Sequence, residues 1–122
     1  MDEAKILVVD DEEEICGLTK SILSKKNYNV LTATNAKEAL EIVTREQPHV
    51  VLLDILLGSS SGLDLLSKIK EINKNIKVIM ISALDDDETI IKAKSLGADD
   101  YISKPFTATY LNELTKEKIS GL

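Results

Sequence analysis

The chain has 122 residues, a formal net charge of −6, and 43% hydrophobic but only 3% aromatic residues. This length and apolar fraction suit a single domain with an aliphatic core, which we expect to span residues 1–122. The composition argues against direct nucleic-acid binding by this domain, because such binding needs a basic surface and often stacked aromatic side chains.

Three weaker features of the sequence indicate the cellular compartment of the protein. The single cysteine, Cys16, cannot form an internal disulfide, which fits a reducing compartment, and we expect it to be a small core residue. The acidic amino terminus lacks the basic start and apolar run of a secretory signal. No apolar stretch approaches the roughly 20 residues that cross a membrane. We therefore expect a cytoplasmic protein with no membrane-spanning segment.

In chain order, short apolar runs alternate with longer amphipathic segments. This alternation predicts five strand–helix units, with strands at residues 6–9, 29–33, 50–53, 78–81 and 101–102 and helices at about residues 12–26, 35–46, 63–72, 85–96 and 107–119. Asn35, with Glu38 three residues later, is typical of a helix start, and Gly97 is typical of a helix end.

The composition of the strands indicates the fold class. Runs such as ILVV, VVLL and VIMI are apolar at every position, as expected for strands that are buried on both faces of a parallel sheet. Helices that alternate with such strands cover both faces of the sheet. The sequence therefore predicts a doubly wound α/β fold.

Polar residues follow four of the predicted strands. Asp10 and Asp11 follow the first strand, Asp54 the third, Ser82 the fourth and Lys104 the fifth. Any one of these is more often a turn, capping or solvated residue than a functional one. The carboxyl ends of parallel strands share one edge of the sheet, where such folds bind ligands, so it is the convergence that predicts a site.

The chemistry of this set is specific. Three carboxylates repel one another unless a cation lies among them, and hard oxygen ligands suit Mg²⁺. The metal and Lys104 could neutralise a transferring phosphoryl group, and Ser82 could donate a hydrogen bond to it. A carboxylate is a competent nucleophile at phosphorus, and Asp54 is held between apolar neighbours at the end of a central strand.

The segments ILVVDDEEE, VVLLDILL, ISA at residues 81–83 and GADDYISKPF at residues 97–106 resemble the receiver domain of bacterial two-component response regulators. The resemblance covers essentially the whole chain. It implies a flavodoxin-like, five-stranded parallel sheet of order 2-1-3-4-5 with five helices. It also implies that Asp54 accepts the phosphoryl group, that Asp10 and Asp11 hold Mg²⁺ with Asp54, and that Leu56 lends its backbone carbonyl to the metal.

The same resemblance implies a switch. Ser82 and Lys104 would contact the phosphoryl group, Tyr101 would change rotamer with Ser82, and the Lys104–Pro105 peptide bond would be cis. The phosphodonor would be a sensor histidine kinase or a phosphotransfer protein, and small phosphodonors could substitute. The face of the fourth helix, fifth strand and fifth helix would control an output domain of a longer protein, a partner, or homodimerisation. Chemistry would be confined to self-phosphorylation and slow autodephosphorylation.

The loop after the third strand departs from the usual pattern of the family. Gly58 stands where the family often has a proline, and the small, polar segment 58–62 predicts a more mobile loop. Leu56 and Leu84 occupy positions that, in the family, control access of the attacking water. Two leucines there predict a shielded and relatively long-lived phosphoryl state.

Other functions fit the residues less well. A Mg²⁺-dependent phosphatase or phosphotransferase with an aspartate nucleophile usually needs a second aspartate where this chain has Leu56. A flavin-binding domain would need a Ser/Thr-rich phosphate loop where Asp10 and Asp11 stand. A degenerate receiver that only binds proteins is disfavoured by the intact polar set. The only histidine, His49, begins a strand at the opposite edge and is expected to be structural or solvent-exposed.

Overall fold

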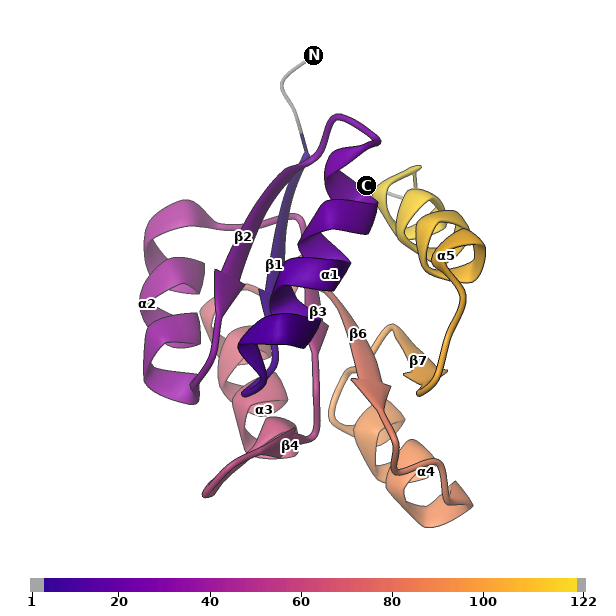
Figure 1. Ribbon diagram of the computed structural model, residues 1–122. Coiled ribbons are helices and arrows are strands. Elements are labelled where there is room, and N and C mark those ends of the chain that lie inside the picture. Colours follow the sequence, from indigo (N-terminus) through magenta and orange to yellow (C-terminus); the bar gives the residue numbers. More distant parts are fainter. Residues whose placement is uncertain (1–3, 121–122) are drawn as a thin grey trace.

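The computed structural model describes residues 4–120. Figure 1 shows a central parallel sheet in the strand order β2-β1-β3-β6-β7 with helices on both faces. This is the predicted order 2-1-3-4-5 when the strands of the main sheet are counted in sequence. The elements are β1 Lys5–Val9, α1 Glu13–Ser24, β2 Asn29–Ala33, α2 Ala36–Glu46, β3 Val50–Leu53, β4 Leu56–Leu57, β5 Ser60–Ser61, α3 Gly62–Ile72, β6 Lys77–Ser82, α4 Asp87–Ser95, β7 Asp100–Ser103 and α5 Ala108–Ser120.

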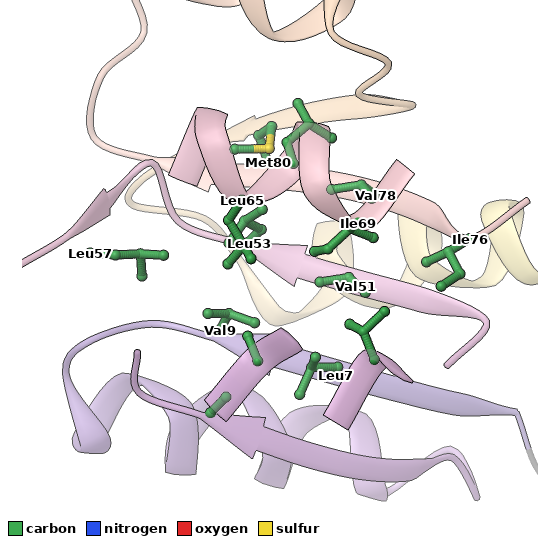
Figure 2. Close-up of a cluster of buried hydrophobic side chains, with 14 of the residues drawn as sticks. Leu7, Val9, Val51, Leu53, Leu57, Leu65, Ile69, Ile76, Val78 and Met80 are labelled. Carbon is green, nitrogen blue, oxygen red and sulfur yellow. The ribbon is translucent and has the colours of Figure 1, made fainter. Parts of the chain in front are cut away.

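The two faces of the sheet carry separate aliphatic cores. Helices α2, α3 and α4 bury side chains against one face, in the cluster that Figure 2 shows around Leu53, Leu65 and Met80. Helices α1 and α5 cover the other face through residues such as Leu23 and Leu111. Strands β1 and β3 are apolar and buried at almost every position, as the unbroken apolar runs predicted.

The local signals at the helix ends act as the sequence predicted. The Asn35 side chain accepts a hydrogen bond from the backbone N–H of Glu38 and begins α2. Asp86 does the same for α4 through Thr89. Gly97 follows α4 with φ of +106°, a conformation that favours glycine over residues with a Cβ atom.

The segment after β3 differs from the predicted loop. Leu56–Leu57 and Ser60–Ser61 pair as a two-residue antiparallel hairpin, β4–β5, with Gly58 at φ of +61° in its turn. Short polar residues do not show the two-residue alternation that marks a strand, so the hairpin could not be read from the sequence. Among residues 4–120, no helix is both long enough and apolar enough to span a lipid bilayer.

Candidate functional site

The register of the sheet brings Asp10 and Asp54 together. Strands β1 and β3 are neighbours and pair Val9 with Leu53, so the residues that follow these two lie side by side at the carboxyl edge. The backbone N–H of Asp54 donates to the carbonyl of Val9 at 3.1 Å. Both carboxylates are almost fully buried, with Asp10 4% and Asp54 6% exposed. Buried carboxylates this close need a countercharge.

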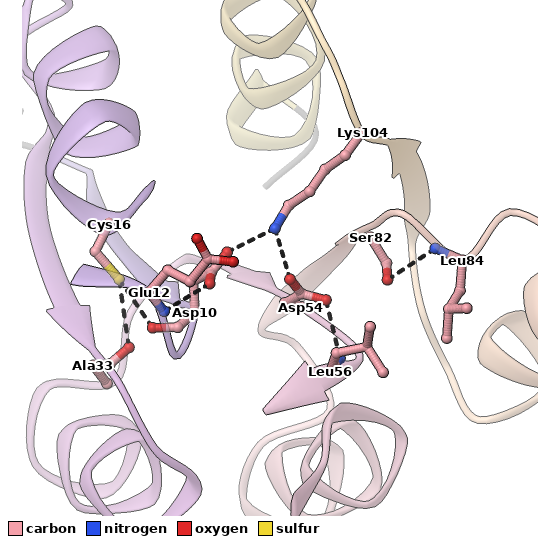
Figure 3. Close-up of polar contacts among 9 residues, drawn as sticks. All are labelled: Asp10, Glu12, Cys16, Ala33, Asp54, Leu56, Ser82, Leu84 and Lys104. Atoms are coloured by element: carbon pink, nitrogen blue, oxygen red, sulfur yellow. Dashed lines mark hydrogen bonds and ion pairs between the residues drawn. The ribbon is translucent and has the colours of Figure 1, made fainter. Parts of the chain in front are cut away.

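Lys104 supplies that charge from the loop after β7. Its Nζ lies 2.7 Å from Oδ2 of Asp54 and 2.9 Å from Oδ2 of Asp10, so one ammonium group bridges the two carboxylates (Figure 3). Burial alone would lower the pKa of Lys104, but the hydrogen bonds to Asp54 and Asp10 outweigh it and raise that pKa above its ordinary value. The lysine therefore remains charged at neutral pH.

Backbone N–H groups fix the second oxygen of each carboxylate. Leu56 donates to Oδ1 of Asp54, and Glu12 donates to Oδ1 of Asp10, both at 3.0 Å. Each aspartate thus accepts a hydrogen bond from the residue two positions ahead, which is common for aspartate at a turn. The arrangement directs both Oδ2 atoms toward Lys104 and the edge of the sheet.

A second acidic group overlaps the first. Carboxylate oxygens of Asp10, Asp11 and Glu12 lie within 4.8 Å of one another. Asp11 and Glu12 are exposed, and Asp54 belongs to the pair with Lys104 instead. A group of hard carboxylate oxygens beside the buried carboxylates of Asp10 and Asp54 is chemically suited to Mg²⁺. Glu12 was not predicted at the site, although the acidic run 10–14 was a signal for it.

Gly62 allows the strand and the next helix to meet at Asp54. A Cβ atom at Gly62 would lie 2.0 Å from the carbonyl oxygen of Asp54 and 2.6 Å from Cα of Ile55. The backbone N–H of Gly62 also donates to the carbonyl of Ile55 at 2.7 Å. Any side chain there would push the acceptor strand away from α3. The sequence indicated Gly62 only as part of the small, polar segment 58–62, because close backbone contacts leave no pattern in a sequence.

Ser82 and Tyr101 are connected through Leu84. The backbone N–H of Leu84 donates to Oγ of Ser82 at 3.2 Å, and the Tyr101 hydroxyl donates to the carbonyl of Leu84. Burial raises the pKa of the Tyr101 hydroxyl, and the nearby Ser82 hydroxyl opposes this rise. Within residues 4–120, no hydrogen bond joins the Ser82 hydroxyl to Asp54. Ser82 is fully buried on the strand next to the Asp54 strand.

The other predicted positions are also placed. The Lys104–Pro105 peptide bond is cis, in agreement with the expectation from sequence. Leu56 and Leu84 are 53% and 38% exposed; Figure 3 shows Leu56 beside Asp54 and Leu84 beyond Ser82. His49 lies at the amino-terminal edge of the sheet, where its Nδ1 accepts a hydrogen bond from the backbone N–H of Lys5 at 2.9 Å. This contact, far from the acidic edge, agrees with the structural role expected for His49.

Cys16 is buried on α1, as expected, and has contacts at the back of the site. Its Sγ lies 3.3 Å from the carbonyl oxygen of Asp10 and 3.7 Å from that of Ala33 (Figure 3). Burial raises the pKa of the Cys16 thiol above its ordinary value. The group is therefore a neutral S–H donor rather than a reactive thiolate.

Comparisons with known proteins agree with this geometry. The family model described as the response regulator receiver domain matches residues 6–116. The sporulation initiation phosphotransferase F of Bacillus subtilis is 36% identical over 113 residues, which are 93% of this chain and 91% of that protein. The chain spans under half the length of several other curated relatives, whose names are those of transcriptional or regulatory proteins.

Solved structures give the same result. The CheY-like receiver domain protein from Methanospirillum hungatei has a TM-score of 0.95 at 34% identity, covering 98% of this chain and 96% of that one. The BeF3-activated DrrB receiver domain has a TM-score of 0.90, also at 34% identity, covering 98% and 99%. With its acidic pocket at the predicted edge of the predicted fold, the chain belongs to the response regulator receiver domain family and is a phospho-accepting domain of two-component signalling rather than a catalytic enzyme.

Proposed function

We propose that Asp54 is the phosphoryl acceptor of a receiver domain that spans residues 1–122. The observation that carries this assignment is the Asp54 carboxylate itself, buried at the end of a central strand and bonded to Lys104 at 2.7 Å. Such a carboxylate is held rigidly. The Lys104 ammonium beside it could stabilise the negative charge of a phosphoryl group bound there.

The transfer step is a displacement at phosphorus. An Asp54 carboxylate oxygen forms a bond to phosphorus while the bond from phosphorus to the donor's histidine nitrogen breaks, and that nitrogen keeps the electron pair. The Lys104 ammonium then contacts a phosphoryl oxygen, and the Ser82 hydroxyl donates a hydrogen bond to another. We assign Mg²⁺ to Asp10, Asp11, Asp54 and the backbone carbonyl of Leu56, where its role is to neutralise charge that develops on the phosphoryl oxygens.

A macromolecular phosphodonor, a histidine kinase or a phosphotransfer protein, would dock beside the site, in the cytoplasm. An apolar groove runs from α1 to Lys104 and is lined by Ile15, Leu18, Thr19, Ile22, Ala83, Pro105 and Phe106. Leu18 is 59% exposed in it and continues an apolar surface with its neighbours in the groove, the kind of surface that a partner helix covers. The groove ends at Lys104, which contacts Asp54. A partner helix lying in the groove would therefore bring its phosphohistidine to Asp54.

Docking can be separated from chemistry by one variant. We expect Leu18→Asp to slow transfer from autophosphorylated histidine kinases by about tenfold or more, the effect of losing one apolar anchor. Labelling by acetyl phosphate should be unchanged, because a small donor does not need the groove. Equal loss with both donors would contradict the docking assignment.

We place the output of the switch on the face of α4, β7 and α5. Helix α4 buries only Ala93 among its described residues, so it is weakly anchored and suited to move. Tyr101 touches the loop that leads from Ser82 into this helix. Movement of Ser82 toward a phosphoryl group would alter that contact and pass the change to an output domain, a partner or a second copy of the chain. Tyr101→Ala should uncouple partner binding from phosphorylation; if both stay unchanged, Tyr101 has no such role.

Leu56 and Leu84 support a slow loss of the phosphoryl group, because their exposed side chains lie beside Asp54 and Ser82 respectively and would hinder an attacking water. We expect a phosphoryl lifetime well above seconds in the presence of Mg²⁺. Replacing Leu56 with Asn should shorten it. A lifetime of seconds in the unmodified protein would contradict this shielding.

Mass spectrometry tests the central assignment. Treatment with acetyl phosphate and Mg²⁺ should add one phosphoryl group to the protein, and Asp54→Asn should abolish the gain. A gain that survives Asp54→Asn, or no gain in the unmodified protein, would overturn the assignment of Asp54.

A further inference from the structure

The thiol of Cys16 lies directly behind Asp10. It is 4% exposed, and its Sγ is 3.3 Å from the Asp10 carbonyl oxygen and 3.7 Å from that of Ala33. The Ala33 carbonyl already accepts the backbone N–H of Asp10 at 3.1 Å. Among residues 4–120, no backbone N–H donates to the Asp10 carbonyl, so the thiol is its donor. A buried carbonyl without a hydrogen-bond donor would cost the free energy of its desolvation, so this contact stabilises the fold.

Three hydrogen bonds close a ring around the turn from β1 to α1. The Glu12 N–H donates to Oδ1 of Asp10 at 3.0 Å, the Cys16 N–H donates to the carbonyl of Glu12 at 3.1 Å, and the Cys16 thiol returns to the carbonyl of Asp10. Both the backbone and the side chain of Asp10 are therefore held by the first turn of α1 (Figure 3). The only carboxylate oxygen left outside the ring is Oδ2, which contacts Lys104.

We propose that Cys16 is a positioning residue of the site: its S–H···O=C bond fixes the turn at Asp10 so that Oδ2 is held facing Lys104 and a bound cation. This inference rests on the proposed function, because it assigns Asp10 to the metal. A plain core residue at position 16 would fill the same space without holding the turn. Groups that orient a metal ligand typically change metal affinity by about 10- to 100-fold when they are removed.

Two substitutions separate the hydrogen bond from the packing. Cys16→Ala removes the donor, and we expect it to weaken Mg²⁺ binding about tenfold, the lower end for an indirect contact. Cys16→Ser keeps a donor of similar size, so its Mg²⁺ affinity should stay within about threefold of the unmodified protein. Val30→Ala is the matched control: Val30 belongs to the same core cluster but pairs with Ile6, four residues before Asp10. It should lower the melting temperature and leave Mg²⁺ affinity unchanged.

The measurements are isothermal titration with MgCl₂ and the infrared S–H stretch. Because Cys16 is the only cysteine, its S–H band is unique in the protein. The band should show a hydrogen-bonded thiol and should shift when Mg²⁺ is added, a response that a space-filling residue would not give. A band typical of a free thiol would overturn the proposal, as would unchanged Mg²⁺ affinity in Cys16→Ala or equal weakening in Val30→Ala.

Failure of the proposed function would look different. If the unmodified protein neither binds Mg²⁺ nor accepts phosphoryl from acetyl phosphate, both the function and the role of Cys16 are overturned. If it does both, and Cys16→Ala does so equally well, only the positioning role is overturned.

Discussion

Replacing Lys104 with methionine isolates the charge at the centre of the site. Methionine keeps most of the side-chain volume but removes both ion pairs, at 2.7 Å to Asp54 and 2.9 Å to Asp10. Those carboxylates would stay buried with no countercharge. Removing one partner of a buried pair costs about 3–5 kcal/mol. The Lys104 side chain is 21% exposed, so water screens part of this loss, and we expect about 2–3 kcal/mol.

Urea denaturation without MgCl₂ measures the loss of unfolding free energy in Lys104→Met, and denaturation with MgCl₂ measures how much of it the metal restores. In the unmodified protein Mg²⁺ has to compete with the Lys104 ammonium for carboxylate oxygens, whereas in Lys104→Met it does not. A ligand present at 100 times its dissociation constant stabilises by about 2.7 kcal/mol, so tighter binding gives a larger gain at equal concentration. We therefore expect Mg²⁺ to stabilise Lys104→Met more than the unmodified protein.

The control is Lys118→Met. Lys118 pairs with Asp100 at 3.3 Å, and the Asp100 side chain is 34% exposed, so this pair is more open to solvent. Its loss should cost less than about 1 kcal/mol and should not respond to Mg²⁺. If Lys104→Met is as stable as the unmodified protein without metal, or gains no more from Mg²⁺, then Lys104 is not the countercharge of the site.

Three further predictions address other parts of the molecule. Gly62→Ala should destabilise the fold by more than about 3 kcal/mol and slow acetyl phosphate labelling, because its Cβ would meet the backbone of Asp54; a normal denaturation midpoint would contradict this. Thr115→Val should raise the unfolding free energy by about 1 kcal/mol, because the fully buried Thr115 hydroxyl has no hydrogen-bond partner among residues 4–120, and a fall would show that it has one. The raised pKa of Lys104 means that the stabilisation from its ion pairs is complete below the unfolded pKa, about 10.4, and is lost as pH rises through the folded pKa. The unmodified protein should therefore lose stability in that pH range more steeply than Lys104→Met. Parallel curves of stability against pH for the two proteins would refute this prediction.

Much of the fold was readable because its signals are local. Apolar runs such as residues 6–9 and 50–53 predict buried strands wherever they occur, and Asn35 and Gly97 mark helix ends through their own backbone chemistry. The β4–β5 hairpin was missed because it depends on where β3 ends and α3 begins. Its serines have no strand pattern of their own.

The sequence by itself determined which groups could act: acidic residues after two strands, a lysine after the last one, and a chain order that sends them to the same edge. Only the tertiary structure decided that Lys104 bridges Asp10 and Asp54, that Gly62 must lack a side chain, and that Cys16 reaches the Asp10 carbonyl. The physical reason is range. Strand and helix signals act within a few residues, whereas these contacts depend on the register of strands that are distant in sequence.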